Sequence, residues 1–124
     1  MDQAETELRE HWQATLGSVP PKFVQEYEMN PIIGEAHTRL RKWIIEDHPD
    51  GLPRAMKELL FVYIDIFCQS AEGGMSHLRE ARKAGLTEMQ LREALSLIVM
   101  TLGPRAWMFA GADIWESRND GAEV

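Results

Sequence analysis

Proline, glycine and helix-capping residues divide this sequence into segments that are each long enough for one helix. Asn30-Pro31 and the run from Thr87 to Gln90 both have the form of a helix start, because Asn and Thr cap well and a Gln three residues later completes a capping box. Within the segments, apolar residues recur at intervals of three and four, which is the period of a helix with one buried face. In the segment after Asn30-Pro31, that face would carry Ile33, Ala36, Leu40 and Trp43. The sequence therefore predicts an all-α fold.

About six to seven helices are expected. Their ranges are 5–16, a short helix from the prolines at 20–21 to residue 27, a helix from 31 to the turn at 47–51, and then 54–70, 75–84, 88–102 and 105–117. The Gly73-Gly74 pair is expected to break or loosen the chain before residue 75. We expect one domain over 1–124, with flexible ends at 1–4 and 118–124.

Composition excludes several classes of partner. The 124 residues suit one domain, and a formal charge of −7 with a pI near 5.0 argues against nucleic acid, which needs clustered Lys and Arg. The longest apolar run, 59–64, is far too short to span a bilayer, and the N-terminus lacks the basic start of a signal peptide. A single cysteine makes no internal disulfide, so cytoplasm is the expected location, without membrane partners.

A polar stripe runs along the expected helix over 54–70. Seven residues make almost two turns, so Glu58 and Asp65 project from nearly the same face, and Cys68 follows one turn later. The other faces are apolar, so this helix is expected to be buried on most sides. Buried carboxylates need partners or take up a proton. The stripe is thus either an acid–base site, a structural ion pair, or a face towards solvent or another subunit.

His77 is the histidine best placed to join that stripe. It follows a turn that returns the chain antiparallel to the helix over 54–70, which would bring it towards Glu58 or Asp65. A carboxylate that binds one imidazole nitrogen fixes the tautomer and leaves the other nitrogen free as acid or base. The alternative is a purely structural histidine.

Other chemistry has weaker signals. Cys68 is either an activated thiol or a small buried apolar residue. His11, His37 and His48 show no metal-ligand spacing with one another or with Cys68, and no HExxH, CxxC or glycine-rich phosphate loop occurs. We therefore expect no metal and no nucleotide cofactor.

Several segments, in this order and spacing, resemble the carboxymuconolactone decarboxylase family, whose AhpD-like superfamily includes peroxidases. They are Val19-Pro20-Pro21-Lys22-Phe23, Asn30-Pro31, Lys57-Glu58-Leu59-Leu60, His77-Leu78-Arg79-Glu80-Ala81, Lys83-Ala84-Gly85-Leu86-Thr87 and Gly103-Pro104-Arg105-Ala106-Trp107. The resemblance covers most of the chain and implies an AhpD-like helical fold.

One departure from the peroxidase branch is informative. Glu58 and His77 match the Glu and His of that branch, but its two cysteines fall on Ser70 and Gly73. Cys68 lies two residues too early and has no second cysteine. Dithiol peroxidase chemistry needs a resolving thiol, so the chain resembles the decarboxylase-like branch instead.

That branch implies a homotrimer or homohexamer without cofactors, and a lyase that decarboxylates a small carboxylated lactone in aromatic compound catabolism. His77, held by Glu58, would supply a proton, with Asp65 and Cys68 as further catalytic candidates. Candidate substrate-binding residues are Ser70, Arg105, Trp107 and Tyr63, and Arg54 is an alternative to Arg105 as the cation that would hold a substrate carboxylate. Arg105 has the alternative of a cap or surface ion pair, and the aromatic residues the alternative of core or interface. Two other functions stay open, namely a single-cysteine peroxidase or reductase and a non-enzymatic helical oligomer that binds a small ligand.

Overall fold

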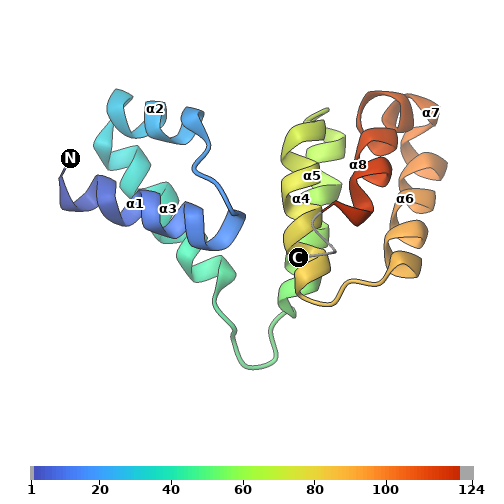
Figure 1. Ribbon diagram of the computed structural model, residues 1–124, viewed down its shortest axis with the longest axis horizontal. Coiled ribbons are helices and arrows are strands. Elements are labelled where there is room, and N and C mark those ends of the chain that lie inside the picture. Colours follow the sequence, from blue (N-terminus) through green and yellow to red (C-terminus); the bar gives the residue numbers. More distant parts are fainter. Residues whose placement is uncertain (1, 121–124) are drawn as a thin grey trace. The chain divides into compact units, whose positions relative to one another are not determined.

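The chain folds into helices joined by short loops (Figure 1). The computed structural model describes residues 2–120, and no strand forms within that range, so the predicted all-α fold is confirmed. The sequence predicts one domain, and the chain forms two compact units, Met1–His48 and Pro49–Val124. Unit 1 contains α1 (Gln3–Leu16), α2 (Pro21–Met29) and α3 (Pro31–Ile45); unit 2 contains α4 (Arg54–Phe67), α5 (Ala71–Lys83), α6 (Glu88–Leu102), α7 (Pro104–Ala106), the π-helix η1 (Trp107–Gly111), α8 (Ala112–Glu116) and the 3₁₀-helix η2 (Ser117–Asn119).

Local capping sets the helix starts that the sequence predicts. The Asn30 side chain accepts a hydrogen bond from the N–H of Ile32 at the start of α3. At α6, the Thr87 hydroxyl accepts from the N–H of Gln90, and the Gln90 side chain accepts from the N–H of Thr87. Both pairs satisfy N–H groups that have no partner inside the helix.

Parts of the two expected flexible ends lie in helices. Gln3 and Ala4 form the start of α1, where the Asp2 carboxylate caps the N–H of Glu5 at 2.8 Å. Ser117–Asn119 continues the helical path as η2. Residues 1 and 121–124 lie outside the described range.

In unit 1, the buried face of α3 is not the apolar face that the sequence suggests. Ile33, Leu40 and Trp43 are exposed, whereas Gly34, Thr38 and Arg41 are buried. The reason is close packing against neighbouring helices of the unit. A Cβ on Gly34 would lie 2.7 Å from the Cα of Tyr27, and the Arg41 guanidinium lies over the Trp12 ring at 4.4 Å.

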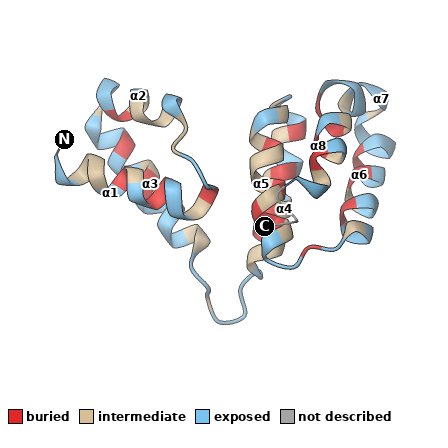
Figure 2. Cartoon of the chain, in the orientation of Figure 1, coloured by how far each residue is buried: buried red, intermediate tan, exposed pale blue. Residues whose placement is uncertain are grey.

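The core of unit 2 lies between α4, α5, α6, η1 and α8, where buried residues line the inner helix faces (Figure 2). Its buried members are Val62, Ile66, Leu78, Ala81, Leu86, Leu91, Leu95, Ile98, Ala110 and Ile114. The most extensive contact between two helices joins α4 and α5. This antiparallel pair carries the candidate site.

The Gly73-Gly74 pair does not break the chain. Both glycines lie inside α5, which begins at Ala71. A Cβ on Gly74 would collide with the Ile114 side chain, and one on Gly73 would lie 2.9 Å from the Ser70 hydroxyl. The glycines therefore serve close packing in the first turns of α5, and the expected start at residue 75 is wrong.

The expected last helix over 105–117 is helical but not uniform. It consists of α7, a π-helical turn and α8. Gly111 lies within the π-turn, and a Cβ there would approach the Trp107 ring to 3.2 Å. The wider turn accommodates the large Trp107 ring over a residue with no side chain.

The outer face of α4 is exposed, contrary to expectation. Leu60, Ile64 and Phe67 have exposed fractions of 47%, 55% and 66%. The helix is buried only where it packs within unit 2, through residues such as Val62 and Ile66. Because α4 is apolar on several faces, its sequence does not show which of those faces the folded chain buries.

Over residues 2–120, none of the helices combines the length and the apolar character that crossing a bilayer requires.

Candidate active site

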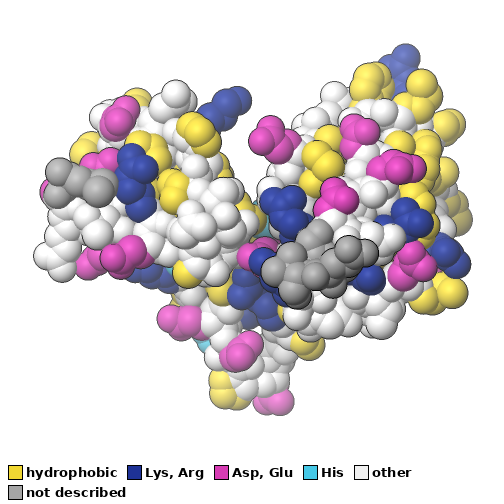
Figure 3. All heavy atoms as spheres, in the orientation of Figure 1, with side chains coloured by type: hydrophobic (Ala, Val, Ile, Leu, Met, Phe, Trp, Pro, Cys, Tyr) yellow, Lys and Arg dark blue, Asp and Glu magenta, His cyan; other side chains and the backbone are white. Residues whose placement is uncertain are grey.

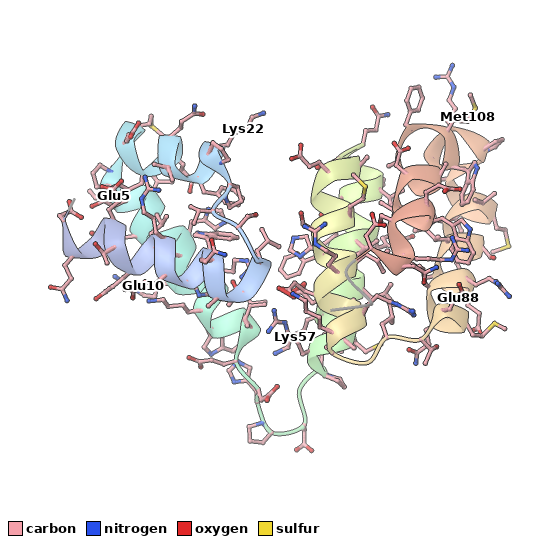
Figure 4. All side chains as sticks on the ribbon, viewed as in Figure 1. Glu5, Glu10, Lys22, Lys57, Glu88 and Met108 are labelled. Carbon is pink, nitrogen blue, oxygen red and sulfur yellow. The ribbon has the colours of Figure 1, made fainter. Side chains whose placement is uncertain are left out.

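Glu58 lies at the centre of the candidate site and is completely buried on α4. Its neighbour in sequence, Lys57, marks this turn of α4 in Figure 4. Glu58 Oε1 lies 3.4 Å from Nε of Arg54, one helical turn earlier, and Oε2 lies 3.1 Å from Nδ1 of His77 on α5. A buried carboxylate is costly unless it is paired and hydrogen-bonded. Both oxygens of Glu58 meet this requirement.

The structure brings His77 against the acidic stripe of α4, as the sequence predicts. Only 12% of the His77 side chain is exposed. An ionised carboxylate only accepts hydrogen bonds, so Nδ1–H donates to Glu58 and Nε2 points elsewhere. The Phe61 ring stacks on the imidazole, with ring centroids 4.4 Å apart and planes inclined by 17°. Glu58 and Phe61 together fix the tautomer and the plane of His77.

Asp65 lies on the other side of the same imidazole. Its Oδ2 is 3.9 Å from Nε2 of His77, too far for a hydrogen bond. This oxygen is buried, and no described residue forms a hydrogen bond to it. Burial is the main reason that the pKa of Asp65 is raised; the charge of His77 lowers that pKa, and the charge of Glu58 raises it. The stripe therefore meets His77 with two carboxyl groups in different environments.

Ser70 lies beside Asp65, but Cys68 is exposed. The Ser70 hydroxyl and Asp65 Oδ2 lie 2.9 and 3.1 Å from the position that a Cβ on Gly73 would occupy. Cys68 is the C-cap residue of α4, and its side chain is open to solvent. The alternative of a small buried apolar cysteine is therefore wrong. Within residues 2–120, no described contact joins the thiol to His77.

The other predicted substrate-binding residues lie apart from the Glu58–His77 pair. Tyr63 is five residues from Glu58, so it projects about 140° away around the helix axis, and it is 38% exposed. Arg105 is exposed on α7. Trp107 lines a separate cavity of about 430 Å³, together with Arg92, Leu95, Ser96, Val99, Met100 and Trp115. The structure does not bring these three side chains to His77.

Arg54 and Phe61 also contribute to the site. The sequence predicts Arg54 as a cation that could hold a substrate carboxylate, and in the structure its Nε lies 3.4 Å from Glu58, four residues along the helix, a spacing that often pairs opposite charges. Phe61 follows Glu58 by three residues and so shares its face of α4, but in the sequence it is one of many apolar residues. Phe61 was therefore missed, and helical periodicity is the signal that could have found it.

Metal binding has no geometric support in the part of the chain that the structure describes. Over residues 2–120, no three or more His, Cys, Asp or Glu side chains form a group that could hold a metal ion.

Comparisons with known proteins place the chain in a family. The sequence pattern of the carboxymuconolactone decarboxylase family matches residues 31–116. The structure is similar to a crystal structure from Burkholderia xenovorans LB400, of a protein provisionally assigned as a carboxymuconolactone decarboxylase. The TM-score is 0.84 and the sequence identity 26%, covering 98% of this chain and 95% of that one. No curated protein matches. The match over residues 31–116 means that the chain belongs to the carboxymuconolactone decarboxylase family.

Proposed function

We propose that the chain is a cofactor-independent lyase that decarboxylates a small carboxylated, lactone-like metabolite. Membership of the carboxymuconolactone decarboxylase family supports the reaction class. The observation that carries the residue assignment is the 3.1 Å contact between Nδ1 of His77 and the fully buried Glu58. In this proposal His77 is the acid–base group and Glu58 is its positioning residue.

The chemistry requires a correctly placed proton donor. Loss of carbon dioxide leaves an electron pair on carbon, which an adjacent carbonyl stabilises as an enolate and which a proton must finally quench. Glu58 holds one nitrogen of His77, so the Nε2 edge is available to move that proton. The Phe61 ring on the imidazole face keeps the edge in one orientation. A positioned imidazole of this kind typically contributes about 10²–10⁴-fold to the rate.

A thiol enzyme is the second candidate because Cys68 is exposed and accessible to a peroxide or disulfide. The sequence has no second cysteine, so such an enzyme would need an external thiol to complete its cycle. A binding oligomer without catalysis is the third candidate. Roles for Arg105, Trp107 and Tyr63 in binding stay predictions from the sequence.

We further propose that the protein is a homotrimer or homohexamer. Apolar side chains gather along the edge of unit 2 where α6 and α7 lie (Figure 3). Exposed members there include Leu97, Met100 and Met108, and Figure 4 shows Met108 at the outer end of this region. Exposed apolar surface of this extent is typical of a face that another chain covers. Light scattering checks this proposal, and a clean monomer would contradict it. A cytoplasmic location stays a prediction from the sequence.

Turnover measurements separate the three functions. Purified protein is incubated with a panel of small carboxylated lactones, and carbon dioxide release is compared among the wild type, His77→Gln and Cys68→Ser. We expect release by the wild type and Cys68→Ser and its loss in His77→Gln. Thiol-dependent peroxide reduction that is lost only in Cys68→Ser would favour the second function. No turnover in any assay would favour the binding oligomer.

A further inference from the structure

The outer face of α4 exposes a continuous apolar stripe. Its members are Met56, Leu60, Tyr63, Ile64 and Phe67, and their exposed fractions range from 37% to 66%. Leu60 and Phe67 follow Glu58 by two and nine residues, so at 3.6 residues per turn they project about 180° away from it. The stripe and the acidic face that meets His77 therefore lie on opposite sides of one helix.

The spacing along the stripe is that of a helix that packs against another helix. Met56, Leu60, Tyr63 and Phe67 are separated by four, three and four residues, the interval at which apolar residues form the seam between two packed helices. Ile64 widens this seam. The intervals are the same from either end, so the stripe is complementary to a second copy of itself that runs in the opposite direction.

The area of the stripe is sufficient for a specific contact between two copies. A large side chain presents about 200 Å² when it is fully exposed, so the exposed fractions of the stripe correspond to about 500 Å² on one chain. Pairing two stripes would bury about 1,000 Å², which is the size at which specific protein interfaces begin. Residues beside the stripe would add to this area.

The charge of the chain also favours contact through this face. A formal charge of −7 makes two copies repel each other, but the stripe contains no ionisable group except the Tyr63 phenol. The two acidic side chains of α4, Glu58 and Asp65, lie on the opposite face. Two copies that meet through the stripe thus keep these carboxyl groups away from each other.

We propose that the stripe is an interface between two copies of this chain, in which the two α4 helices pack antiparallel about a two-fold axis. The inference rests on the oligomer proposed above and is independent of the proposed reaction. The antiparallel direction follows from the helix dipoles, because it places the positive N-terminal end of each α4 beside the negative C-terminal end of the other.

A two-fold contact selects between the two proposed assemblies. A trimer has a three-fold axis alone, whereas a hexamer built from two trimers has two-fold axes as well. In the hexamer, the exposed apolar face of α6 and α7 joins chains within a trimer, and the stripe on α4 joins the two trimers. The hexamer is therefore the assembly that covers both apolar faces.

This interface accounts for the composition of α4. The sequence predicts a helix that is buried on most sides, and unit 2 buries only the side that carries residues such as Val62 and Ile66. A second copy would cover the remaining apolar side. Tyr63, a candidate substrate-binding residue in the sequence, is an interface residue in this arrangement.

Light scattering on the full chain tests the stripe. The wild type should have the mass of six chains of 14.2 kDa each. Leu60→Asp places a carboxylate from each chain in an apolar seam, so it should halve that mass to the mass of a trimer. Leu60→Met keeps the position apolar and should remain a hexamer. Leu60 is exposed in the single chain, so circular dichroism should show the same helix content in both variants.

The outcomes separate the stripe from the oligomer proposed above. A wild-type trimer, or a hexamer that Leu60→Asp leaves intact, would overturn the stripe as an interface and keep that oligomer. A wild-type dimer that Leu60→Asp converts to a monomer would support the stripe and contradict the trimer and the hexamer. A wild-type monomer would overturn both.

Disulfide cross-linking tests the direction of the two helices. The variant combines Met56→Cys and Phe67→Cys with Cys68→Ser. Positions 56 and 67 of one helix are about 16 Å apart, too far for a disulfide within a chain. In the antiparallel pair, position 56 of one chain lies opposite position 67 of the other, so mild oxidation should give dimers whose disulfides join 56 to 67. Mass spectrometry that instead finds 56 joined to 56 would overturn the antiparallel arrangement.

Discussion

Each of the two units holds a histidine whose Nδ1 lies close to a glutamate carboxylate, and the two pairs differ in burial and surroundings. In unit 1, Nδ1 of His37 lies 2.7 Å from Glu26, and the two side chains are 35% and 30% exposed. In unit 2, Nδ1 of His77 lies 3.1 Å from Glu58, and the side chains are 12% and 0% exposed. The shorter contact therefore belongs to the more exposed pair.

Distance alone does not identify a site. His37 lies edge-on to the rings of Trp12 and Phe23, in an aromatic cluster that packs unit 1. His77 instead faces a second carboxylate, Asp65, whose buried oxygen accepts no hydrogen bond from residues 2–120. His77 is largely buried and lies next to a second carboxyl group, that of Asp65. Packing alone does not explain this arrangement.

The largest expected difference between the pairs is in turnover. His77→Gln should lower the rate of carbon dioxide release by about 10²–10⁴-fold, because it removes the group that moves the proton. His37→Gln should leave the rate close to that of the wild type. Steady-state kinetics on the same lactone substrate measure both. Equal losses in the two variants would mean that His77 acts through folding and not through chemistry.

Stability should show the next largest difference. Glu58→Leu retains most of the side-chain volume but removes both acceptor oxygens, so it should lower the free energy of unfolding by about 1–3 kcal/mol. Glu26→Leu breaks a partly exposed pair and should cost less than about 1 kcal/mol. Urea denaturation followed by circular dichroism gives both values. A larger loss of unfolding free energy in Glu26→Leu than in Glu58→Leu would contradict this prediction.

A smaller effect concerns the pH dependence of stability. The raised pKa of Asp65 means that the folded state holds this proton more tightly than the unfolded state, so stability falls as pH rises from 3.8 through the folded pKa. The Asp65→Asn variant has no titrating group at this position, so it does not lose stability in this way as pH rises. It should be more stable than the wild type at neutral pH, with the difference disappearing below pH 3.8.

Asp47→Asn, at an exposed position, serves as the control for that measurement and should follow the wild type at all pH values. If urea denaturation finds Asp65→Asn less stable than the wild type at neutral pH, Asp65 is held in its ionised form by its neighbours.

Cys68→Ser should have the smallest effect. The thiol is exposed at the end of α4, so it should react rapidly with Ellman's reagent in the folded protein. Carbon dioxide release should be unchanged in the serine variant. A loss of release on this substitution would bring Cys68 into the site and weaken the contrast between His77 and His37.

The sequence predicts most of the helix starts because capping is local. Asn30 and Thr87 cap the helices that follow them, as their neighbours in sequence indicate. The start of α5 was missed because Gly73 and Gly74 are needed for close packing. One residue that packs against Gly74, Ile114, is distant in sequence. A glycine that permits close packing looks the same in sequence as one that ends a helix.

The sequence predicts part of the candidate site, as it predicts most of the helix starts. Helical periodicity placed Glu58 and Asp65 on one face, and the turn that returns the chain along that face pointed to His77, which the family resemblance also matched. Periodicity could not show that Trp107 lines a different cavity or that Cys68 is exposed, because both depend on which faces the helices bury. In α3 the same ambiguity led to the wrong face, since a buried Arg41 stacks on Trp12 where apolar residues were expected.

The exchange rate of the ring N–H protons with water shows whether buried Glu58 holds His77. Nitrogen-15 NMR resolves the Nδ1–H signals of His77 and His37 in one sample. We expect the His77 proton to be protected from exchange with water through its bond to buried Glu58, and to lose that protection in Glu58→Leu, while the His37 proton exchanges fast. A His77 proton that exchanges as fast as that of His37 would mean that Glu58 does not hold the imidazole.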